Sequence, residues 1–125
     1  MPVLNMKIKE IYSKVDIEWC RSMMEKHDLS NKDVYGRLQI TKGALSKKLN
    51  PDSDRPLKSN ESKIAIYTAI KELIDIKTLS KEIIAFSKNN NLSFKDSIAF
   101  FKSKFEIEKN DRMLWVLSEI EEKKC

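Results

Sequence analysis

The side chains of this chain that could do chemistry are concentrated between Leu29 and Pro51. This stretch, LSNKDVYGRLQITKGALSKKLNP, holds both glycines of the chain, five basic residues and one acidic residue. Its centre is a run of small and polar residues, Thr41, Lys42, Gly43 and Ala44. Such residues can approach base edges, where lysine donates to O6 and N7 of guanine and alanine packs on the thymine methyl group. The run therefore has the chemistry of a segment that reads bases in the major groove.

Basic side chains surround this run at positions from which they could reach phosphate groups. They are Lys32, Arg37, Lys47 and Lys48. Residues 1–60 hold 12 basic and 8 acidic side chains, a net charge of +4, whereas residues 61–125 hold 12 and 11, a net charge of +1. The uneven charge fits a polyanionic partner for the first half. A lysine-rich solvated surface would give the same balance, so charge alone leaves both interpretations open.

Two short helices are predicted to position these residues. Ser30 and Asp33 have the spacing of a capping box, so the first helix begins directly after Ser30. Its apolar positions are Val34, Tyr35 and Leu38. Thr41 is suited to cap a second helix that runs to about Leu49, and Asn50-Pro51 stops it. The stretch is therefore predicted to be a helix, a short turn and another helix.

These residues resemble the helix-turn-helix of lambda-repressor and Cro-like DNA-binding domains. The shared features are the Leu-Ser opening, an apolar residue after the turn (Ile40), the hydroxyl cap Thr41, the Leu45-Ser46 pair and the closing Leu-Asn. The resemblance covers residues 16–76 and includes a helix before the motif and one after it. It implies a five-helix domain that binds double-stranded DNA sequence-specifically, with helix 41–49 in the major groove. It is typical of a small bacterial or phage transcriptional regulator.

The resemblance also implies roles for individual residues. Lys42, Gly43 and Ser46 would lie on the groove-facing side of the second helix. Asn31 would touch a phosphate or support a base contact, and Asn50 would contact a phosphate just after the helix. Domains of this family generally act as dimers on two-fold operators, so a homodimer is expected.

Four positions depart from the family pattern. Tyr35 stands where a small residue, mostly alanine, is usual, and Gln39 replaces the glycine of the turn. Lys48 occupies a normally apolar position, and Pro51 replaces a loop glycine. A residue as large as Tyr35 could force the helices apart, and a non-glycine at position 39 must accept an unusual backbone conformation. The domain is therefore expected to be divergent, and a fold that has turned to protein partners stays open.

The rest of the chain predicts further helices and no strand, so the expected fold class is all-α, with six or seven helices. These further helices are predicted over residues 17–27, 61–76, 94–105 and 112–124. Thr78 either caps another helix to Phe86 or lies within a continuation of the one before. The sequence SKNNN (87–91) is interpreted as a break, and Asp111 as the cap of the last helix. The first dozen residues are expected to form a short helix or an arm on the core.

Two domains are predicted from this pattern. Residues 1–76 would be the repressor-like domain, and residues 77–125 a C-terminal helical segment for dimerisation or partner binding. The sequence Leu-Ser-x-Lys-Asp occurs at 29–33 and again at 92–96. Two copies of a helix-turn-helix unit would explain this, but two ordinary capping boxes are the preferred explanation.

The C-terminal segment has more large apolar residues than one face of each helix requires. Phe100 and Phe101 are adjacent, as are Trp115 and Val116, and neighbours on a helix cannot all point one way. Either the helices are sandwiched in one core, or these four residues form a homodimer or partner interface. The second possibility favours an alternative function, a protein-interaction module such as an antitoxin-like, anti-defence or phage regulatory factor.

Other chemistries find no support in the sequence. There is no paired-carboxylate, nucleophile-base or phosphate-loop motif, so an enzyme is not expected, and no metal or cofactor is expected either. Cys20 falls in an apolar helical pattern and is predicted to be buried. His27 is interpreted as a partner of a helix C-terminus. No apolar run is long enough to span a membrane, so a cytoplasmic protein is expected.

Overall fold

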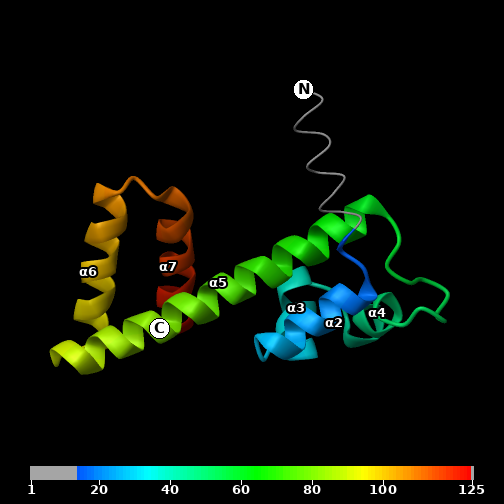
Figure 1. Cartoon of the computed structure of the whole chain (residues 1–125), viewed down its shortest axis with the longest axis horizontal. Coiled ribbons are helices and arrows are strands. Elements are labelled where there is room, and N and C mark those ends of the chain that lie inside the picture. The colour runs from blue at the N-terminus through cyan, green and yellow to red at the C-terminus, as the bar shows by residue number, and fades with distance from the viewer. Residues whose placement is uncertain (1–13, 125) are drawn as a thin grey trace. The chain divides into compact units, whose positions relative to one another are not determined.

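The computed structural model describes residues 14–124, and this part of the chain is all-helical. It contains six helices and no strand: α2 (Ile17–Lys26), α3 (Asn31–Leu38), α4 (Lys42–Lys48), α5 (Asn60–Asn90), α6 (Phe94–Ile107) and α7 (Asp111–Lys124) (Figure 1). The all-α prediction is confirmed. The short helix or arm expected in the first dozen residues lies outside the described range.

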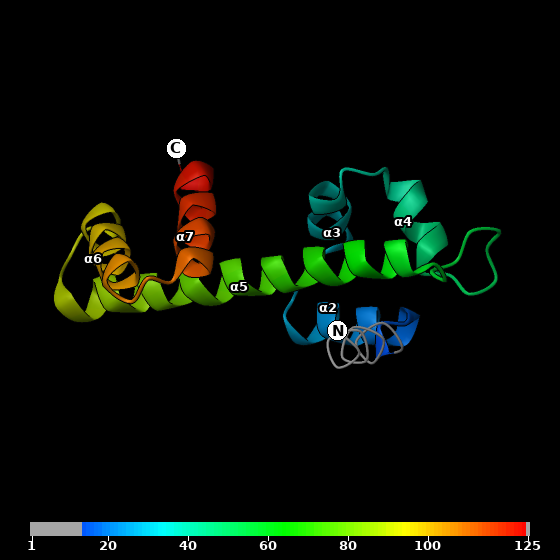
Figure 2. The same ribbon diagram turned by 90° about the horizontal axis from the view of Figure 1, so that it is seen from above.

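The chain divides into two compact units, and the division falls inside α5. The first unit extends to Leu73 and the second begins at Ile74. In the first unit, the initial part of α5 runs between α2 on one side and α3 and α4 on the other (Figure 2). Every helix of this unit buries apolar side chains, among them Cys20, Val34, Leu45, Ile66 and Ile70. The short helices therefore gain their stability by packing, because isolated helices of this length are marginal in water.

Side-chain caps begin α2, α3 and α4 where the sequence predicts them. Ser30 accepts a hydrogen bond from the Asp33 amide at 3.1 Å, and Asp33 accepts one from the Ser30 amide at 3.0 Å. Asp16 caps α2 by accepting from the Trp19 amide at 2.7 Å. Thr41 caps α4 by accepting from the Ala44 amide at 3.1 Å. These caps satisfy amides of the first turn that have no partner within the helix.

The turn between α3 and α4 depends on a left-handed residue that is not glycine. Gln39 has φ 58° and ψ 42°, so the sequence-based expectation of an unusual backbone at this position is confirmed. The amide of Ile40 donates to the Tyr35 carbonyl at 3.0 Å, which closes a Schellman turn. The left-handed conformation costs a residue with a β-carbon on the order of 1 kcal/mol. The chain reverses here in spite of that strain.

The same helix ending recurs along the chain, each time without glycine. Asp28, Asn91 and Lys109 also have positive φ. Leu29, Leu92 and Asn110 follow them, and each of these amides donates to the carbonyl five residues earlier at 2.8–3.0 Å. The repeated Leu-Ser-x-Lys-Asp sequence is therefore a repeated local turn: a left-handed residue, a leucine and a serine cap. Two ordinary serine caps, the explanation preferred from the sequence, therefore account for the repeat.

The second unit is built on the later part of α5. Figure 1 shows α6 and α7 as an antiparallel hairpin in this unit. Its core is a cluster of nine buried residues, Ile76, Leu79, Ile83, Ile98, Phe101, Phe105, Val116, Leu117 and Ile120. The spacing of three and four residues on each helix places one apolar face of each toward the others. The buried hydroxyl of Ser97 lies 2.6 Å from that of Ser87, so the polar group is satisfied inside this core.

Two helix boundaries differ from the predicted ones. The break predicted over SKNNN is confined to its last residue, because α5 continues to Asn90 and the left-handed Asn91 follows it. The Ser87 hydroxyl donates to the Ile83 carbonyl at 2.9 Å, and the Asn90 amide group donates to the Phe86 carbonyl at 2.9 Å. These polar side chains support the last turn instead of ending it. Likewise, Asn110 and not Asp111 caps α7, by accepting from the Met113 amide at 3.2 Å.

Replacing the strained turn residue should stabilise the first unit. Gln39→Gly is expected to raise the free energy of unfolding by about 0.5–1 kcal/mol, because glycine adopts positive φ without a steric cost. Urea unfolding followed by circular dichroism measures this change. Gln39→Ala keeps the β-carbon and is the control. Equal stabilities of the two variants would contradict strain at this position.

The only described cysteine should be chemically inert in the folded protein. Cys20 is fully buried, as the sequence predicts, and burial, with a smaller effect of the Asp16 charge, raises the pKa of its thiol to about 12. In a Cys125→Ser variant, iodoacetamide at pH 8 should modify Cys20 only after urea is added, since the thiolate is the reactive form.

This pKa also predicts how stability depends on pH. The pKa of the unfolded thiol is 9.0, well below that of the folded thiol. The contribution of Cys20 to folding stability is therefore complete below about pH 9 and declines from there toward pH 12. The stability difference between Cys125→Ser and a Cys20→Ala, Cys125→Ser variant should therefore shrink between pH 8 and pH 10. A constant difference, or labelling of native Cys20, would contradict its burial.

Candidate nucleic-acid interface

α4 buries one face and leaves a polar face exposed. Leu45 and Leu49 are buried, whereas Lys42, Gly43, Ser46 and Lys47 are exposed. Ala44 is half-buried between the two faces. The spacing of four residues between the leucines fixes which side turns inward. The small and basic residues predicted to contact bases are therefore accessible to a large partner. Thr41, which lies beside them, is exposed too.

A shallow groove borders α4 on the side of α2 and the start of α3. Its lining residues are Arg21, Met24, Asn31, Leu45, Ser46, Leu49 and Asn50. Three of them, Asn31, Ser46 and Asn50, are polar residues to which the resemblance assigns DNA contacts. The structure brings these three to one groove although they come from two helices and the segment after α4. Arg21 adds a cation from α2 to the same groove.

A second groove borders α4 on the side of the loop 51–59. It is lined by Thr41, Gly43, Ala44, Lys47, Lys48 and Arg55. Its lining thus includes three cations and two small residues, Gly43 and Ala44. A β-carbon on Gly43 would meet nothing within 4 Å, so the fold itself does not require glycine there. The exposed face of α4 therefore lies between two grooves that both carry hydrogen-bond donors.

Three separate groups hold the carbonyls at the end of α4. The Ser53 hydroxyl donates to the Lys47 carbonyl at 2.5 Å, and the Leu57 amide donates to the Lys48 carbonyl at 3.0 Å. The Arg21 guanidinium donates to the Leu49 carbonyl at 2.6 Å. These bonds satisfy groups that a helix end leaves without partners. They also fold the loop back along α4, with Leu57 buried as its anchor.

The charge around α4 is one-sided. Residues 34–51 contain four basic residues, Arg37, Lys42, Lys47 and Lys48, and no acidic one. Asp33, just before this run, accepts the hydrogen bond of the capping box. The loop after α4 adds two exposed carboxylates, Asp52 and Asp54, and that of Asp54 lies 3.4 Å from the Lys47 ammonium. The exposed face of α4 itself is therefore cationic, and Lys32 at the start of α3 is exposed as well.

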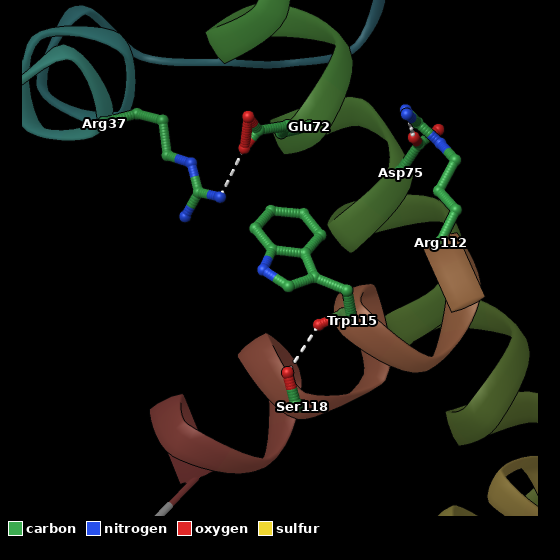
Figure 3. A network of polar contacts seen from close by, with 6 residues as sticks. All are labelled: Arg37, Glu72, Asp75, Arg112, Trp115 and Ser118. Carbon is green, nitrogen blue, oxygen red and sulfur yellow. Dashed lines mark hydrogen bonds and ion pairs between the residues drawn. The ribbon is translucent and has the colours of Figure 1, made fainter.

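Arg37, which is predicted to contact a phosphate, is engaged by a carboxylate within the first unit. Its guanidinium pairs with Glu72 of α5 at 2.5 Å, and each side chain is only 21% exposed (Figure 3). The sequence could not reveal this pair, because its partners are separated by 35 residues. Arg37 therefore ties α3 to the first part of α5.

The unusual Lys48 is explained by its neighbours. It is half-buried, and its ammonium donates to the Ser62 hydroxyl of α5 at 3.3 Å. The ammonium thus finds a hydrogen-bond partner at a position where the family has an apolar residue. Tyr35, the large residue in α3, is half-buried, and its carbonyl accepts the hydrogen bond that closes the turn. Both departures are therefore accommodated within the first unit.

The four aromatic and apolar residues predicted as an interface fall into two groups. Phe101 and Val116 are buried in the core of the second unit, so a partner could not contact them. Phe100 and Trp115 are 50% and 41% exposed, and the Phe100 ring stacks on Phe86 at a centroid distance of 4.5 Å. Near Trp115, Arg112 of α7 pairs with Asp75 of α5 (Figure 3). One residue of each adjacent pair, Phe101 or Val116, therefore belongs to the core of the second unit. The other residue, Phe100 or Trp115, lies on the surface.

The described residues offer no cluster that could hold a metal ion, since no three His, Cys, Asp or Glu side chains converge there. No helix in residues 14–124 is long and apolar enough to cross a membrane. Comparisons of the chain with protein-family models, with curated proteins and with solved structures found no match.

Sequence reasoning missed two residues of this surface, Arg21 and Arg55. Arg21 belongs to a helix that the motif does not include, and Arg55 lies in a loop with no periodic pattern. Only the hydrogen bonds that fold the loop back place Arg55 beside Lys47 and Lys48. The sole sequence signal was that two of the four arginines of the chain fall near the motif but outside it.

Because Arg37 pairs with Glu72, replacing Arg37 should lower the free energy of unfolding. Arg37→Met should lower the free energy of unfolding by about 1 kcal/mol, because it leaves the carboxylate of Glu72 partly buried without its partner. A double-mutant cycle with Glu72→Gln, measured by urea unfolding, isolates the pair from other contacts of Arg37. Lys32→Met on the exposed side of α3 is the matched control and should change stability by less than about 0.5 kcal/mol. A coupling energy of zero would show that the pair has no structural role.

Proposed function

We propose that this chain binds double-stranded DNA with the exposed face of α4 in the major groove. The observation that carries the proposal is the arrangement around α4: a small, basic, exposed helix face between two grooves lined by donors. A run of 18 residues without an acidic side chain, 34–51, contains this face. Phosphate backbones flank the major groove on both sides, so a helix bordered by donors on both sides complements a duplex.

Each polar residue has a role that follows from its position. Lys42, Gly43 and Ser46 would face base edges from the exposed side of α4, with Thr41 and Ala44 at its start. The phosphate contacts would come from the two flanks, through Asn31, Lys32, Lys47, Asn50 and, newly, Arg21, whose guanidinium has further N–H donors besides the one bonded to the Leu49 carbonyl. Lys48 lines the second groove while its ammonium is bonded to Ser62, so its contribution would be mainly to the field of the surface. Arg37 is left out, since Glu72 engages it.

The wider proposal is a small regulator of transcription of the lambda-repressor and Cro-like type. The left-handed turn at Gln39 supports it, because this is the position at which the family has glycine. The caps at Ser30 and Thr41 support it too, since they begin both helices of the motif where the resemblance requires. A five-helix repressor-like domain with a dimerising C-terminal segment remains part of this proposal.

A protein-interaction module is the second candidate, and one surface favours it. On α6, Phe100 is 50% exposed and Ile107 is 83% exposed, and residues seven apart lie on the same side of a helix. Exposed apolar side chains on one helix face are typical of protein contacts. Either a second copy of the chain or another protein would bury them. This surface belongs to the second unit and is compatible with DNA binding by the first.

Duplex binding by variants of α4 tests the main proposal. The full chain should select duplexes with a common sequence from a random library, in a manner that weakens as salt rises. Lys42→Ala should then relax preference at one position, at a cost of about 1–3 kcal/mol for the selected base pair. Lys47→Ala should weaken all duplexes about equally and lower the salt slope by about one. Fluorescence anisotropy at several salt concentrations measures both effects.

Two further results bear on the choice between the candidates. Lys102→Ala removes an exposed cation of the second unit and should leave duplex binding unchanged. If the folded chain binds no duplex at low salt, DNA binding is excluded and the protein-interaction module becomes the better candidate.

A further inference from the structure

The loop 51–59 carries both signs of charge next to the exposed face of α4. Asp52, Asp54, Arg55 and Lys58 are all exposed. Of the two carboxylates, that of Asp54 lies 3.4 Å from the ammonium of Lys47. The next residue, Arg55, is positively charged and lines the second groove together with Lys47 and Lys48. The loop therefore places an anion and a cation side by side at the edge of the surface proposed for DNA.

The position of Asp54 is fixed by the backbone of the loop. Ser53, the residue before it, donates to the carbonyl of Lys47 itself at 2.5 Å. The Asp52 amide donates to the Asn50 side chain at 3.0 Å, and Leu57 anchors the far end of the loop. These bonds tie the loop to the last turn of α4. The carboxylate consequently stays within reach of Lys47 although both side chains are largely solvated.

We infer that Asp54 is an internal competitor for the phosphate that Lys47 would contact, and that it sets the overall affinity for duplex DNA. This inference rests on the proposed function. A phosphate approaching Lys47 must replace the carboxylate as the partner of the ammonium, and it also meets the repulsion of Asp54. Because phosphates are the same at every site, this competition lowers binding to all sequences and leaves base preference unchanged.

The size of the effect of Asp54 on duplex affinity follows from how exposed the Lys47–Asp54 pair is. The Lys47 and Asp54 side chains are 54% and 69% exposed, so solvent weakens their attraction and the carboxylate moderates binding without preventing it. Removing the charge should therefore strengthen duplex binding only about two- to fivefold. The dependence of the binding constant on salt should steepen by less than about one in the logarithmic slope, because Lys47 supplies a single phosphate contact and the wild type already makes part of it.

The test compares two neighbouring acidic residues in the full chain. A random-sequence duplex and the selected duplex are titrated with wild type, Asp54→Asn and Asp52→Asn by fluorescence anisotropy at 0.05–0.3 M salt. Asp54→Asn should tighten both duplexes by the same factor of about two to five. Asp52→Asn removes the same charge from the same loop, but its carboxylate does not pair with Lys47, so it should change affinity by less than the Asp54 variant. In a Lys47→Ala background, Asp54→Asn should lose most of its effect.

Distinct results would overturn the inference. Equal gains from Asp52→Asn and Asp54→Asn would mean a general charge effect of the loop. The same gain with and without Lys47 would mean that Asp54 does not act through that lysine. If wild type binds duplexes and Asp54→Asn does not tighten them, the inference alone fails. If wild type and both variants bind no duplex, the proposed function fails, and the inference fails with it.

Discussion

α4 has only seven residues, which is too few for a helix to be stable by itself in water. It is stabilised by hydrogen bonds at both ends and by the burial of Leu45 and Leu49. Thr41 caps its start, and Ser53, Leu57 and Arg21 hold the carbonyls of its end. With its backbone satisfied in this way, the outer face needs no apolar side chains. It can carry lysines and a serine, and also a glycine, which costs about 1 kcal/mol of helix propensity relative to alanine.

The turns that arrange the helices are strained in one consistent way. Four helices end at a left-handed residue with a side chain, and both glycines stand inside helices instead. The steric cost at each turn is offset by the hydrogen bonds that close it and by the caps that follow. This pattern has a consequence for the surface. Gly43 lies in α4 with open space around it, so its lack of a β-carbon leaves helix backbone uncovered in the middle of the cationic face.

The loop 51–59 contributes both to the surface proposed to bind DNA and to the proposed weakening of that binding by Asp54. The loop that satisfies the end of α4 also brings Asp54 to Lys47 and Arg55 to the second groove. Local stability and surface charge are therefore linked, because the bonds that fix the helix fix the charges too. The exposed Phe100 and Ile107 of α6 belong to the other unit, and they offer a protein contact that is chemically separate from the cationic face.

The sequence by itself determined the helices of the motif, their caps and the burial of Cys20. These features depend on residues three or four apart, so a linear pattern contains them. It also identified Gln39 as the position of strain. Only the tertiary structure decided what depends on distant residues: that Arg37 pairs with Glu72, that Lys48 reaches Ser62, and that Phe101 and Val116 are buried while Phe100 and Trp115 are not. The extension of α5 to Asn90 and the return of the loop onto α4 were likewise hidden, because polar residues that look like breaks bond instead to carbonyls placed by the fold.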